Sequence, residues 1–461
     1  MKKIFILLPD GIGLRNFAFT KFQSLGLKMN FDICFWNNTP FPLQDLGFKE
    51  ILIKNPQSHP LTDVLKNARK HIELNLSIAK TKDSVYDKYR FPFSYKNIKS
   101  IFKSLATQFL IFLFSSEKGL RLLQKLINRL EKKTRYYSDS LKTLQKEKPS
   151  FVFCTNQRPL LAIAPLLAAK ELGIPTATFI FSWDNLPKAT MVVETDYYFV
   201  WSEHMKNELR FYYPYIKESQ IKVTGTPQFE SHFNPSILKT KEEFFTENGL
   251  DLNKKYICYS GDDITTSPND PKYLEDVAKA VIKINQSGQN IGILFRRCPV
   301  DFSTRFDQVL ETYKDVIVSV QPKWVKKGEM WNTILPTKED SILLVNTIKH
   351  TECVINLGSS MVFDYATFHK RCLFINYDVD VCVMKNWSVK KIYNYVHFRS
   401  MPNKNAVIWI NSPHEIQSRI ESILTLKEIN VTDAQEWFNK IVGKNPQEAS
   451  ENIWNEISKI L

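Results

Sequence analysis

The sequence predicts a protein of the α/β class, built as two domains that each contain a mainly parallel sheet. Three observations support this fold class. The 461 residues are too many for one ordinary hydrophobic core and fit two or three domains. A hydrophobic content of 43% with 24% charged residues is typical of a globular protein. Short apolar runs alternate with helix-like segments, which indicates parallel sheets covered by helices on both faces.

The first predicted domain covers residues 1–228. Its short apolar runs are bounded by turn residues, as expected of buried strands. The expected strands are 3–8, 31–36, 50–54, 150–155, 176–181, 196–201 and 221–223. Helices are expected after the turn at 10–16 to about residue 27, at 159–172 and at 203–211. Between the third and fourth strands, about residues 60–148 read as a mostly helical, basic insertion.

The second predicted domain covers residues 229–461 and repeats the alternation. The expected strands are 256–260, 291–295, 315–320, 342–345, 353–356 and 372–376. Helices are expected between them, notably at 272–286, 302–313 and 360–368. Residues 432–461 read as two further helices. The pattern does not set their place in the architecture, and we assign them to this domain.

The net charge of +14 implies an anionic partner: nucleic acid, acidic lipid headgroups or a phosphorylated substrate. No helix-turn-helix, zinc-finger or RNP-like pattern is present, so we expect no nucleic-acid partner. Much of the excess charge lies in residues 96–148, around the apolar run 105–114. This run is too short to cross a bilayer, which needs about 20 residues. Two interpretations stay open: a peripheral contact with acidic membrane lipids, or a buried helix with solvated basic flanks.

The seven cysteines show no CxxC pair and no spacing typical of a zinc site. Most of them read as small buried hydrophobic residues. Residues 1–10 read as a strand followed by a turn, rather than as a signal peptide. The odd number of cysteines and this opening favour a cytoplasmic protein, peripheral to the inner face of the membrane if the basic region binds lipid.

The most informative stretch is the turn Gly358-Ser359-Ser360, which ends an apolar run and opens a helix. Unpaired N–H groups, two hydroxyl groups and the helix dipole make such a turn a receptor for phosphate. The alternative interpretation is that one serine simply caps an ordinary helix.

Polar loops follow six of the predicted strands, at 10–16, 155–158, 182–185, 260–263, 296–299 and 358–360. Ligands of open parallel sheets bind beyond the carboxyl ends of the strands, so these loops hold our candidate site residues. Asp10 and Asp184 are the candidate general bases, since a carboxylate can take a proton from an acceptor hydroxyl group. Each has a structural alternative: Asp10 shaping the Gly11/Gly13 turn, and Asp184 holding an Asx-type turn.

Several enzyme classes are excluded by their motifs. The turn Asp10-Gly-Ile-Gly13 lacks the third glycine of the dinucleotide-binding fingerprint, which excludes a dehydrogenase. No GxSxG, HExxH, P-loop or kinase signature is found. His204, near a predicted helix start, is either an acid or base or an ordinary surface histidine.

The chain resembles the GT-B superfamily of nucleotide-sugar glycosyltransferases, and more narrowly enzymes of surface carbohydrate biosynthesis related to CDP-glycerol glycerophosphotransferases. The resemblance covers nearly the whole chain. Its motifs are 10–16 (DGIGLRN), 181–186 (FSWDNL), 223–229 (VTGTPQF) and 358–366 (GSSMVFDYA). It implies two Rossmann-like domains facing one another across a cleft, with the basic helical region as an insertion in the first.

The resemblance also implies roles for individual residues. Ser359 and Ser360 would bind the donor phosphates, and Asp364 would contact the donor or fix its loop. Arg297 matches a basic family position before a His-Pro pair, although Cys298 replaces that histidine here. We assign donor binding to Gly261, Arg297, Gly358, Ser359, Ser360 and Asp364. We assign acceptor binding to Gly11, Gly13, Arg15, Asn16, Gln157 and Trp183.

The expected activity is transfer of a sugar from a nucleotide-sugar donor to a saccharide or lipid-linked acceptor, in the synthesis of capsule, O-antigen or a related polysaccharide. GT-B enzymes generally need no metal, so no metal site and no cofactor besides the substrate are expected. The glutamate pair of the retaining branch is missing, because Ser360 stands eight residues after Glu352, and this favours inversion. The alternatives are a CDP-glycerol-type glycerophosphotransferase, a non-hydrolysing nucleotide-sugar epimerase, and a non-catalytic binding or scaffold protein.

Overall fold

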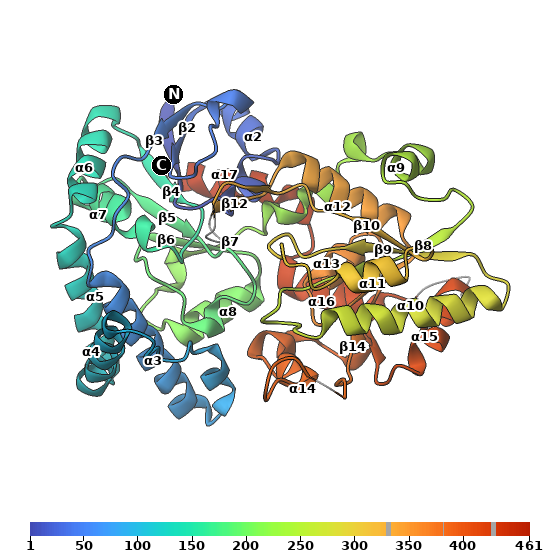
Figure 1. The fold of residues 1–461 in the computed structure, drawn as a ribbon. Helices are drawn as coiled ribbons and strands as arrows, with labels where there is room; N and C mark the ends of the chain where they lie inside the picture. The colour runs from blue at the N-terminus through green and yellow to red at the C-terminus, as the bar shows by residue number, and fades with distance from the viewer. Residues whose placement is uncertain (329–332, 381, 426–429) are drawn as a thin grey trace. The chain divides into compact units, whose positions relative to one another are not determined.

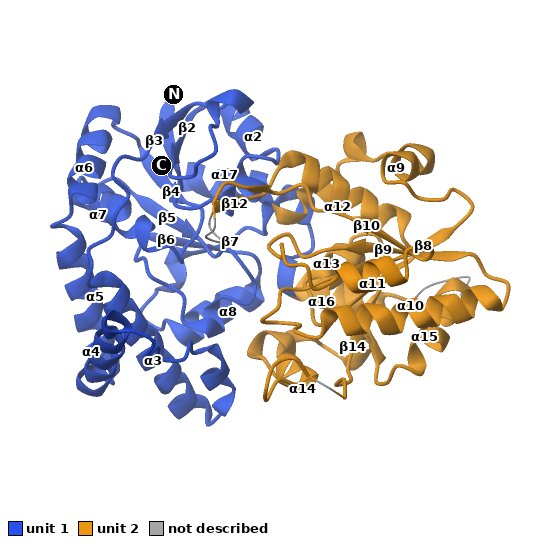
Figure 2. Ribbon diagram, viewed as in Figure 1, with its two compact units in different colours: residues 1–227, 441–461 blue, residues 228–440 orange. Residues whose placement is uncertain are grey.

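The computed structural model describes residues 1–328, 333–380, 382–425 and 430–461. The chain forms two compact units (Figure 2). Unit 1 comprises Met1–Pro227 together with Ile441–Leu461, and unit 2 comprises Gln228–Lys440. Each unit is a parallel sheet covered by helices, as the alternating sequence pattern predicts.

The sheet of unit 1 has seven strands in the order β3-β2-β1-β4-β5-β6-β7, and every strand pair is parallel. Its strands are β1 (Lys2–Leu8), β2 (Phe31–Asn37), β3 (Glu50–Leu52), β4 (Phe151–Cys154), β5 (Thr176–Phe179), β6 (Tyr197–Val200) and β7 (Ile221–Val223). All seven were predicted from the sequence. The strand order reverses at β1, which pairs with β2 on one side and with β4 on the other.

The helices of unit 1 include four that make up the predicted basic insertion between β3 and β4. These four are α3 (Thr62–Thr81), α4 (Ile98–Phe114), α5 (Glu117–Glu131) and α6 (Arg135–Glu147). The others are α1 (Gly13–Phe17), α2 (Phe22–Lys28), α7 (Ile163–Glu171), α8 (Glu203–Tyr212) and α17 (Ala449–Ile460). Within the described residues, no helix is both long enough and apolar enough to cross a membrane.

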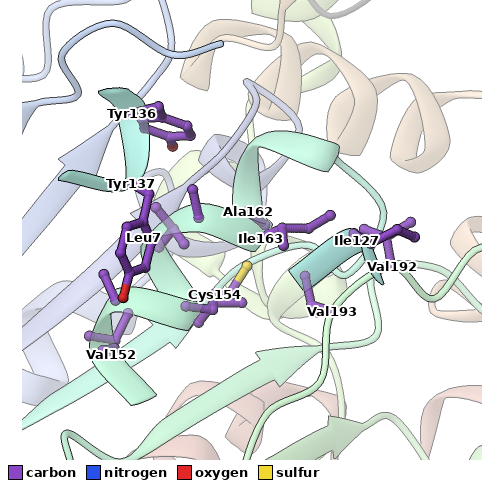
Figure 3. Close-up of a cluster of buried hydrophobic side chains, with 14 of the residues drawn as sticks. Leu7, Ile127, Tyr136, Tyr137, Val152, Cys154, Ala162, Ile163, Val192 and Val193 are labelled. Carbon is purple, nitrogen blue, oxygen red and sulfur yellow. The ribbon is translucent and has the colours of Figure 1, made fainter. Parts of the chain in front are cut away.

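A core of unit 1 lies between β1, β2 and β4 and the helices α3, α5, α6 and α7. Figure 3 shows part of it, where Val152 and Cys154 of β4 lie among Tyr136, Tyr137 and Ile163 of the covering helices. Three helices of the insertion therefore contribute fully buried side chains to the core. From α4, only partly buried apolar side chains reach it.

The sheet of unit 2 has six strands in the order β10-β9-β8-β13-β14-β15, again all parallel. Its strands are β8 (Lys255–Ser260), β9 (Ile291–Arg296), β10 (Ile317–Val320), β13 (Cys353–Asn356), β14 (Arg371–Ile375) and β15 (Ile408–Ile410). A separate antiparallel pair is formed by β11 (Val325–Lys326) and β12 (Ile334–Leu335). The helices are α9 (Lys241–Glu247), α10 (Asp270–Gln286), α11 (Asp307–Thr312), α12 (Lys338–His350), α13 (Met361–Ala366), α14 (Val389–Tyr393), α15 (Glu415–Thr425) and α16 (Thr432–Val442).

One predicted strand, 342–345, is wrong, because these residues lie in the middle of α12. The Thr337 hydroxyl group accepts a hydrogen bond from the Asp340 N–H and caps this helix. A short apolar run does not distinguish a buried helix turn from a buried strand, and here the cap decides. The last strand of the sheet, β15, was not predicted, and neither was the β11/β12 pair.

The end of the chain belongs to unit 1, which corrects its assignment to the second domain. The expected two helices are present as α16 and α17, but residues 441–461 pack with unit 1. Trp454 of α17 is fully buried, and its ring stacks on Phe22 and Phe31 at centroid distances of 4.7 and 5.2 Å. Its indole N–H donates to the Phe22 carbonyl group. Burial of this large aromatic side chain holds the chain terminus on the first unit.

Candidate functional site

Both sheets have the same switch in strand order, and each switch has a candidate loop on either side. In unit 1 the order reverses between β1 and β4, and in unit 2 between β8 and β13. In open parallel sheets, ligands bind at the carboxyl ends of the strands beside such a switch. The loops that begin at Asp10 and Thr155 therefore form one candidate site, and those that begin at Gly261 and Leu357 form the other.

Asp10 follows β1, and its carboxyl group is held from two sides. The Ile12 N–H donates to Oδ1 at 3.2 Å, and Asn156 Nδ2, in the loop after β4, donates to Oδ2 at 2.9 Å. The side chain is 4% exposed. Burial raises the pKa of Asp10 from 3.8 to about 6, against the opposing effects of the Ile12 hydrogen bond and the Arg158 charge. A carboxyl group with this pKa suits a general base that works near neutral pH.

The turn at residues 11–16 packs closely against β4 and leaves one buried amide group unsatisfied. Gly13 has no room for a side chain, because a Cβ atom would lie 2.5 Å from the Thr155 hydroxyl oxygen. The Gly11 carbonyl group accepts from the Leu14 N–H and closes the turn. Asn16 is fully buried, and within the described residues its Nδ2 has no hydrogen-bond partner. A buried polar group of this kind is costly unless another molecule pairs with it.

Arg15 lies next to Asn16 and orients it. Its Nε atom is 3.4 Å from Asn16 Oδ1, and the side chain is half-buried. This contact occupies the amide oxygen and turns the donor side of the amide away from the arginine. Arg15 therefore stays a candidate for acceptor binding through its charge, whereas Asn16, with no exposed surface, would need the turn to open before its Nδ2 could meet an acceptor.

Two other predicted acceptor residues are used inside the protein. Gln157 is buried and joins its own loop to the loop after β5: Nε2 donates to Asn185 Oδ1 at 2.9 Å, and Oε1 accepts from the Phe181 N–H at 3.0 Å. Trp183 is 7% exposed, which leaves little of its ring for a sugar to stack on. In the structure, Gln157 holds the loops in place.

Asp184, the second candidate base, is occupied by its neighbours. One carboxylate oxygen forms an ion pair with Lys188, and the other accepts from Asn185 Nδ2 at 2.9 Å. Both oxygens of this carboxylate are therefore engaged within the segment 184–188. Of the two candidates, Asp10 has the environment that better suits a base.

In unit 2 the turn after β13 has the geometry expected of the Gly-Ser-Ser motif. Gly358 adopts φ +67°, a left-handed conformation that favours glycine. Asn356 Oδ1 accepts from the Ser359 N–H at 2.9 Å, and the Ser359 hydroxyl oxygen accepts from the Met361 N–H at 3.4 Å. Ser359 thus closes the turn just before α13, a helix of six residues whose N-cap residue, Ser360, is exposed.

Asp364 lies within α13 and faces a residue that we did not predict. Its Oδ1 is 3.0 Å from His232 Nε2, and both side chains are almost fully buried. This pair joins α13 to the segment 228–233 at the start of unit 2. Of the two roles implied for Asp364, fixing the loop agrees with its contacts.

The loop after β8 brings the half-buried Asp262 and Asp263 to the other side of the same switch, next to the fully buried Asp270 at the start of α10. A Cβ atom on Gly261 would lie 3.0 Å from the Phe295 ring, so a larger residue would fit here only if this ring shifted. Burial raises the pKa of Asp262 well above its usual value, and the nearby charges of Asp263 and Asp270 raise it further. Burial also raises the pKa of Asp270 to about 6. Within the described ranges, no cluster of three or more His, Cys, Asp or Glu side chains is placed to hold a metal ion.

Arg297 follows β9 but turns into its own loop. Its Nη1 donates to the Ser303 carbonyl group at 2.6 Å, and the guanidinium group lies 5.2 Å from the centre of the Phe306 ring. The side chain is 9% exposed. Burial raises the pKa of the neighbouring Cys298 thiol to about 12, so a neutral thiol stands at the family's histidine position.

Sequence reasoning missed Asn156, His232 and Asp262 as site residues. The parallel order of β1 and β4 could have identified Asn156, since it follows the strand next to Asp10. Asp262 stands next to Gly261, which we did assign. For His232 the sequence offers no signal, because its partner Asp364 is far away along the chain.

No protein-family model matches the sequence, and no curated protein is significantly similar to it. Solved structures match over almost the whole chain. A putative UDP-N-acetylglucosamine 2-epimerase from Listeria monocytogenes has 9% identity and a TM-score of 0.56, over 99% of this chain and 96% of that one. The UDP-GlcNAc 2-epimerase of Methanocaldococcus jannaschii has 14% identity and a TM-score of 0.53, over 100% of both chains. S. aureus MnaA, solved with UDP, has 12% identity and a TM-score of 0.51, over 100% and 97%.

At such identities the similarity concerns the fold. The protein has the fold of two Rossmann-like domains that the GT-B resemblance implied.

Proposed function

We propose that the protein is a nucleotide-sugar-dependent glycosyltransferase that transfers a sugar to a saccharide or lipid-linked acceptor. The observation that supports it most directly is Asp10, a buried carboxyl group with a pKa of about 6 at the strand-order switch of unit 1. Sugar transfer needs a base of this kind to take the proton of the acceptor hydroxyl group. Unit 1 would hold the acceptor, with Arg15 and Asn16 beside the base.

Unit 2 would hold the nucleotide-sugar at its own switch. The exposed Ser360 hydroxyl group would contact the donor phosphates, and the turn formed by Gly358 and Ser359 would position it. Asp262, across the switch, has a raised pKa that favours its protonated form. A protonated carboxyl group can donate a hydrogen bond to the donor and does not repel its diphosphate. Transfer would be inverting and independent of metal, as the resemblance implies.

Nucleotide binding is the first test of this proposal. A ligand bound only by the folded state raises stability by RT ln(1 + [L]/Kd), about 2.7 kcal/mol at 100 times Kd. We expect one of UDP, CDP, GDP, dTDP and CMP to raise the melting temperature. Ser360→Ala should reduce this shift, whereas Ser319→Ala, at an exposed serine on β10, should leave it unchanged. If no nucleotide shifts the melting temperature, the proposal is wrong.

Catalysis is tested at Asp10. We expect Asp10→Asn to keep the nucleotide-induced shift in melting temperature and to lower the turnover of the nucleotide-sugar by 100-fold or more, an order of magnitude typical of a lost general base. A binding or scaffold protein predicts no turnover in either protein. Full turnover by Asp10→Asn would remove Asp10 from the mechanism.

A nucleotide-sugar epimerase is the second candidate. It is favoured by the solved structures with similar folds, two of which are named UDP-GlcNAc 2-epimerases. An epimerase also needs an acid or base near neutral pH, so Asp10 does not separate the two reactions. Interconversion of UDP-sugar epimers without any acceptor would identify the epimerase, and product formation that depends on an acceptor would identify the transferase.

The glycerophosphotransferase alternative and the place in surface polysaccharide synthesis rest on the sequence resemblance alone. Stabilisation by CDP-glycerol rather than by nucleotide-sugars would favour the former. For a lipid-linked acceptor, unit 1 offers a pocket between α3, α5 and residues 211–215. Its lining combines apolar side chains such as Leu120 and Pro214 with Arg69, Lys80 and Arg121, and with the three carboxylates of Glu73, Glu117 and Glu194. The opposite charges balance, so the apolar part of this lining, which suits the hydrocarbon of a lipid, is what supports the assignment.

A further inference from the structure

Helix α4 exposes its apolar side instead of burying it. Seen along the helix, six large side chains with spacings of three or four residues fall on a single stripe. Their exposed fractions lie between 52% and 83%. The stripe consists of Ile98, Phe102, Leu105, Phe109, Phe112 and Leu113. An apolar face this large is unusual on a protein that meets only water, and it marks a binding surface.

The opposite side of α4 faces the protein and is more polar at its centre. Ser104 and Thr107 are the fully buried residues of this helix. The Ser104 hydroxyl group donates to the Ser94 carbonyl group at 2.8 Å, and that of Thr107 donates to the Lys103 carbonyl group at 2.7 Å. Figure 1 shows α4 at the edge of unit 1 beside α3 and α5. The arrangement contradicts the buried-helix interpretation of residues 105–114.

The exposed side of the next helix, α5, mixes cations with leucines. Lys118, Lys125 and Arg129 share this side with Leu122 and Leu126, and all five are exposed. These positions follow one another at three- and four-residue intervals, so they form a single face. Phosphate groups would attract the cations, while the leucines would enter an apolar layer.

Positive charge predominates throughout this region. Residues 96–135 contain ten Lys or Arg and only two Glu, of which Glu131 is buried. Lys96, just before α4, and Lys99, in its first turn, are exposed, whereas the exposed Lys103 forms an ion pair with Asp63 of α3. An apolar protein partner would not require this excess of cations, whereas an anionic lipid surface attracts each of them.

We propose that the outer faces of α4 and α5 bind the surface of a bilayer that contains anionic lipid. We call this surface the α4–α5 face. The stripe of α4 enters the boundary between headgroups and acyl chains, and the cations of both helices contact lipid phosphates. This inference goes beyond the proposed reaction, because membrane binding needs neither donor nor acceptor and would serve a transferase or an epimerase alike.

Vesicle sedimentation of the full chain tests the apolar part. We expect binding to vesicles with 30% phosphatidylglycerol in phosphatidylcholine. The double variant Phe109→Ser/Phe112→Ser should weaken this binding by at least about tenfold, since each ring loses its contact with lipid. The matched control Leu46→Ser/Leu52→Ser removes exposed apolar side chains elsewhere on unit 1 and should bind like the original protein.

Charge tests the choice of lipid. Pure phosphatidylcholine vesicles should bind the chain at least about tenfold more weakly, and raising the salt from 0.1 to 0.5 M should weaken binding to the anionic vesicles. The double variant Lys118→Glu/Lys125→Glu should likewise bind the anionic vesicles more weakly. Equal binding to both vesicle types would overturn the proposed role of the cations.

Two results would overturn the proposal as a whole. One is a chain that keeps a nucleotide-induced shift in melting temperature but does not sediment with anionic vesicles. The other is a concentration-dependent dimer that Phe109→Ser/Phe112→Ser dissociates without any effect on vesicle binding, because a second copy would then occupy the face. Each result leaves the proposed reaction untouched, since nucleotide binding is measured without lipid.

Discussion

Replacing Asp10 by Asn should stabilise the protein at high pH, although Asp10 accepts two hydrogen bonds. The reason is the cost of ionising a carboxyl group that is 4% exposed. Its pKa of about 6, against the ordinary 3.8, means that the folded protein binds this proton more tightly than the unfolded chain does. The protonated Asp10 therefore contributes its full share to the stability of the wild-type protein below about pH 4, and this contribution is lost as the pH rises through 6.

The size of the effect follows from the two pKa values. Their difference corresponds to about 3 kcal/mol at pH 8, and to roughly half of that at pH 5, where the folded protein is still mostly protonated. The asparagine keeps an oxygen for the Ile12 N–H but loses the acceptor for Asn156 Nδ2, at a cost of about 1 kcal/mol. We expect a net stabilisation of about 2 kcal/mol at pH 8 and about 0.5 kcal/mol at pH 5.

Urea denaturation of both proteins at pH 5, 6, 7 and 8 measures this difference. Asp184→Asn is the matched control: it loses the ion pair with Lys188, so it should gain no stability at any of these pH values. The reasoning is refuted if the advantage of Asp10→Asn does not grow between pH 5 and pH 8. In that case Asp10 would not have a raised pKa, and its case as a general base near neutral pH would be lost.

Three further predictions concern packing. Gly358→Ala and Gly249→Ala both place a side chain at a φ near +66°, at a cost of about 1 kcal/mol in stability. Only at position 358 would the new Cβ atom also meet other side chains, at 3.1 Å. Gly358→Ala should therefore lose more stability than Gly249→Ala, and it should also lose the nucleotide-induced shift in melting temperature. Trp454→Ala should cost about 3–5 kcal/mol in urea denaturation and make the C-terminus sensitive to protease; an unchanged midpoint would contradict its place in the core. Gly13→Ala should destabilise by about 1–3 kcal/mol, and a double-mutant cycle with Thr155→Ala should recover part of this loss.

The sequence predicted a helix or strand correctly wherever one local signal determined its type and its ends. The strand at 353–356 was predicted to the residue, because an apolar run is followed by a glycine that takes a left-handed φ. The same kind of run at 342–345 lies in a helix, because the Thr337 cap three residues before Asp340 starts α12. The placement of Trp454 against Phe22 depends on contacts between distant parts of the chain. Local patterns contain no information about such contacts.

The sequence predicted where along the chain the candidate site residues lie, but it did not predict which atoms their side chains contact. Parallel strands bring their following loops to one edge of a sheet, so Asp10 and the loop containing Asn156 meet as expected. Which way a side chain then turns depends on packing. Arg297 follows its strand as predicted, yet its guanidinium group binds the Ser303 carbonyl group. Sequence spacing alone does not foretell that choice.

The orientation of α4 could have been inferred from its own sequence. The run 105–114 is apolar on several sides, which fits both a buried and an interfacial helix. Ser104 and Thr107 break this symmetry, because they are three residues apart and form a small polar strip opposite Phe102 and Phe109. A helix packs most closely where its side chains are small, so the strip faces the protein and the aromatic side faces outward. The observed orientation leaves both Lys99 and the apolar stripe exposed, as the proposed contact with lipid requires.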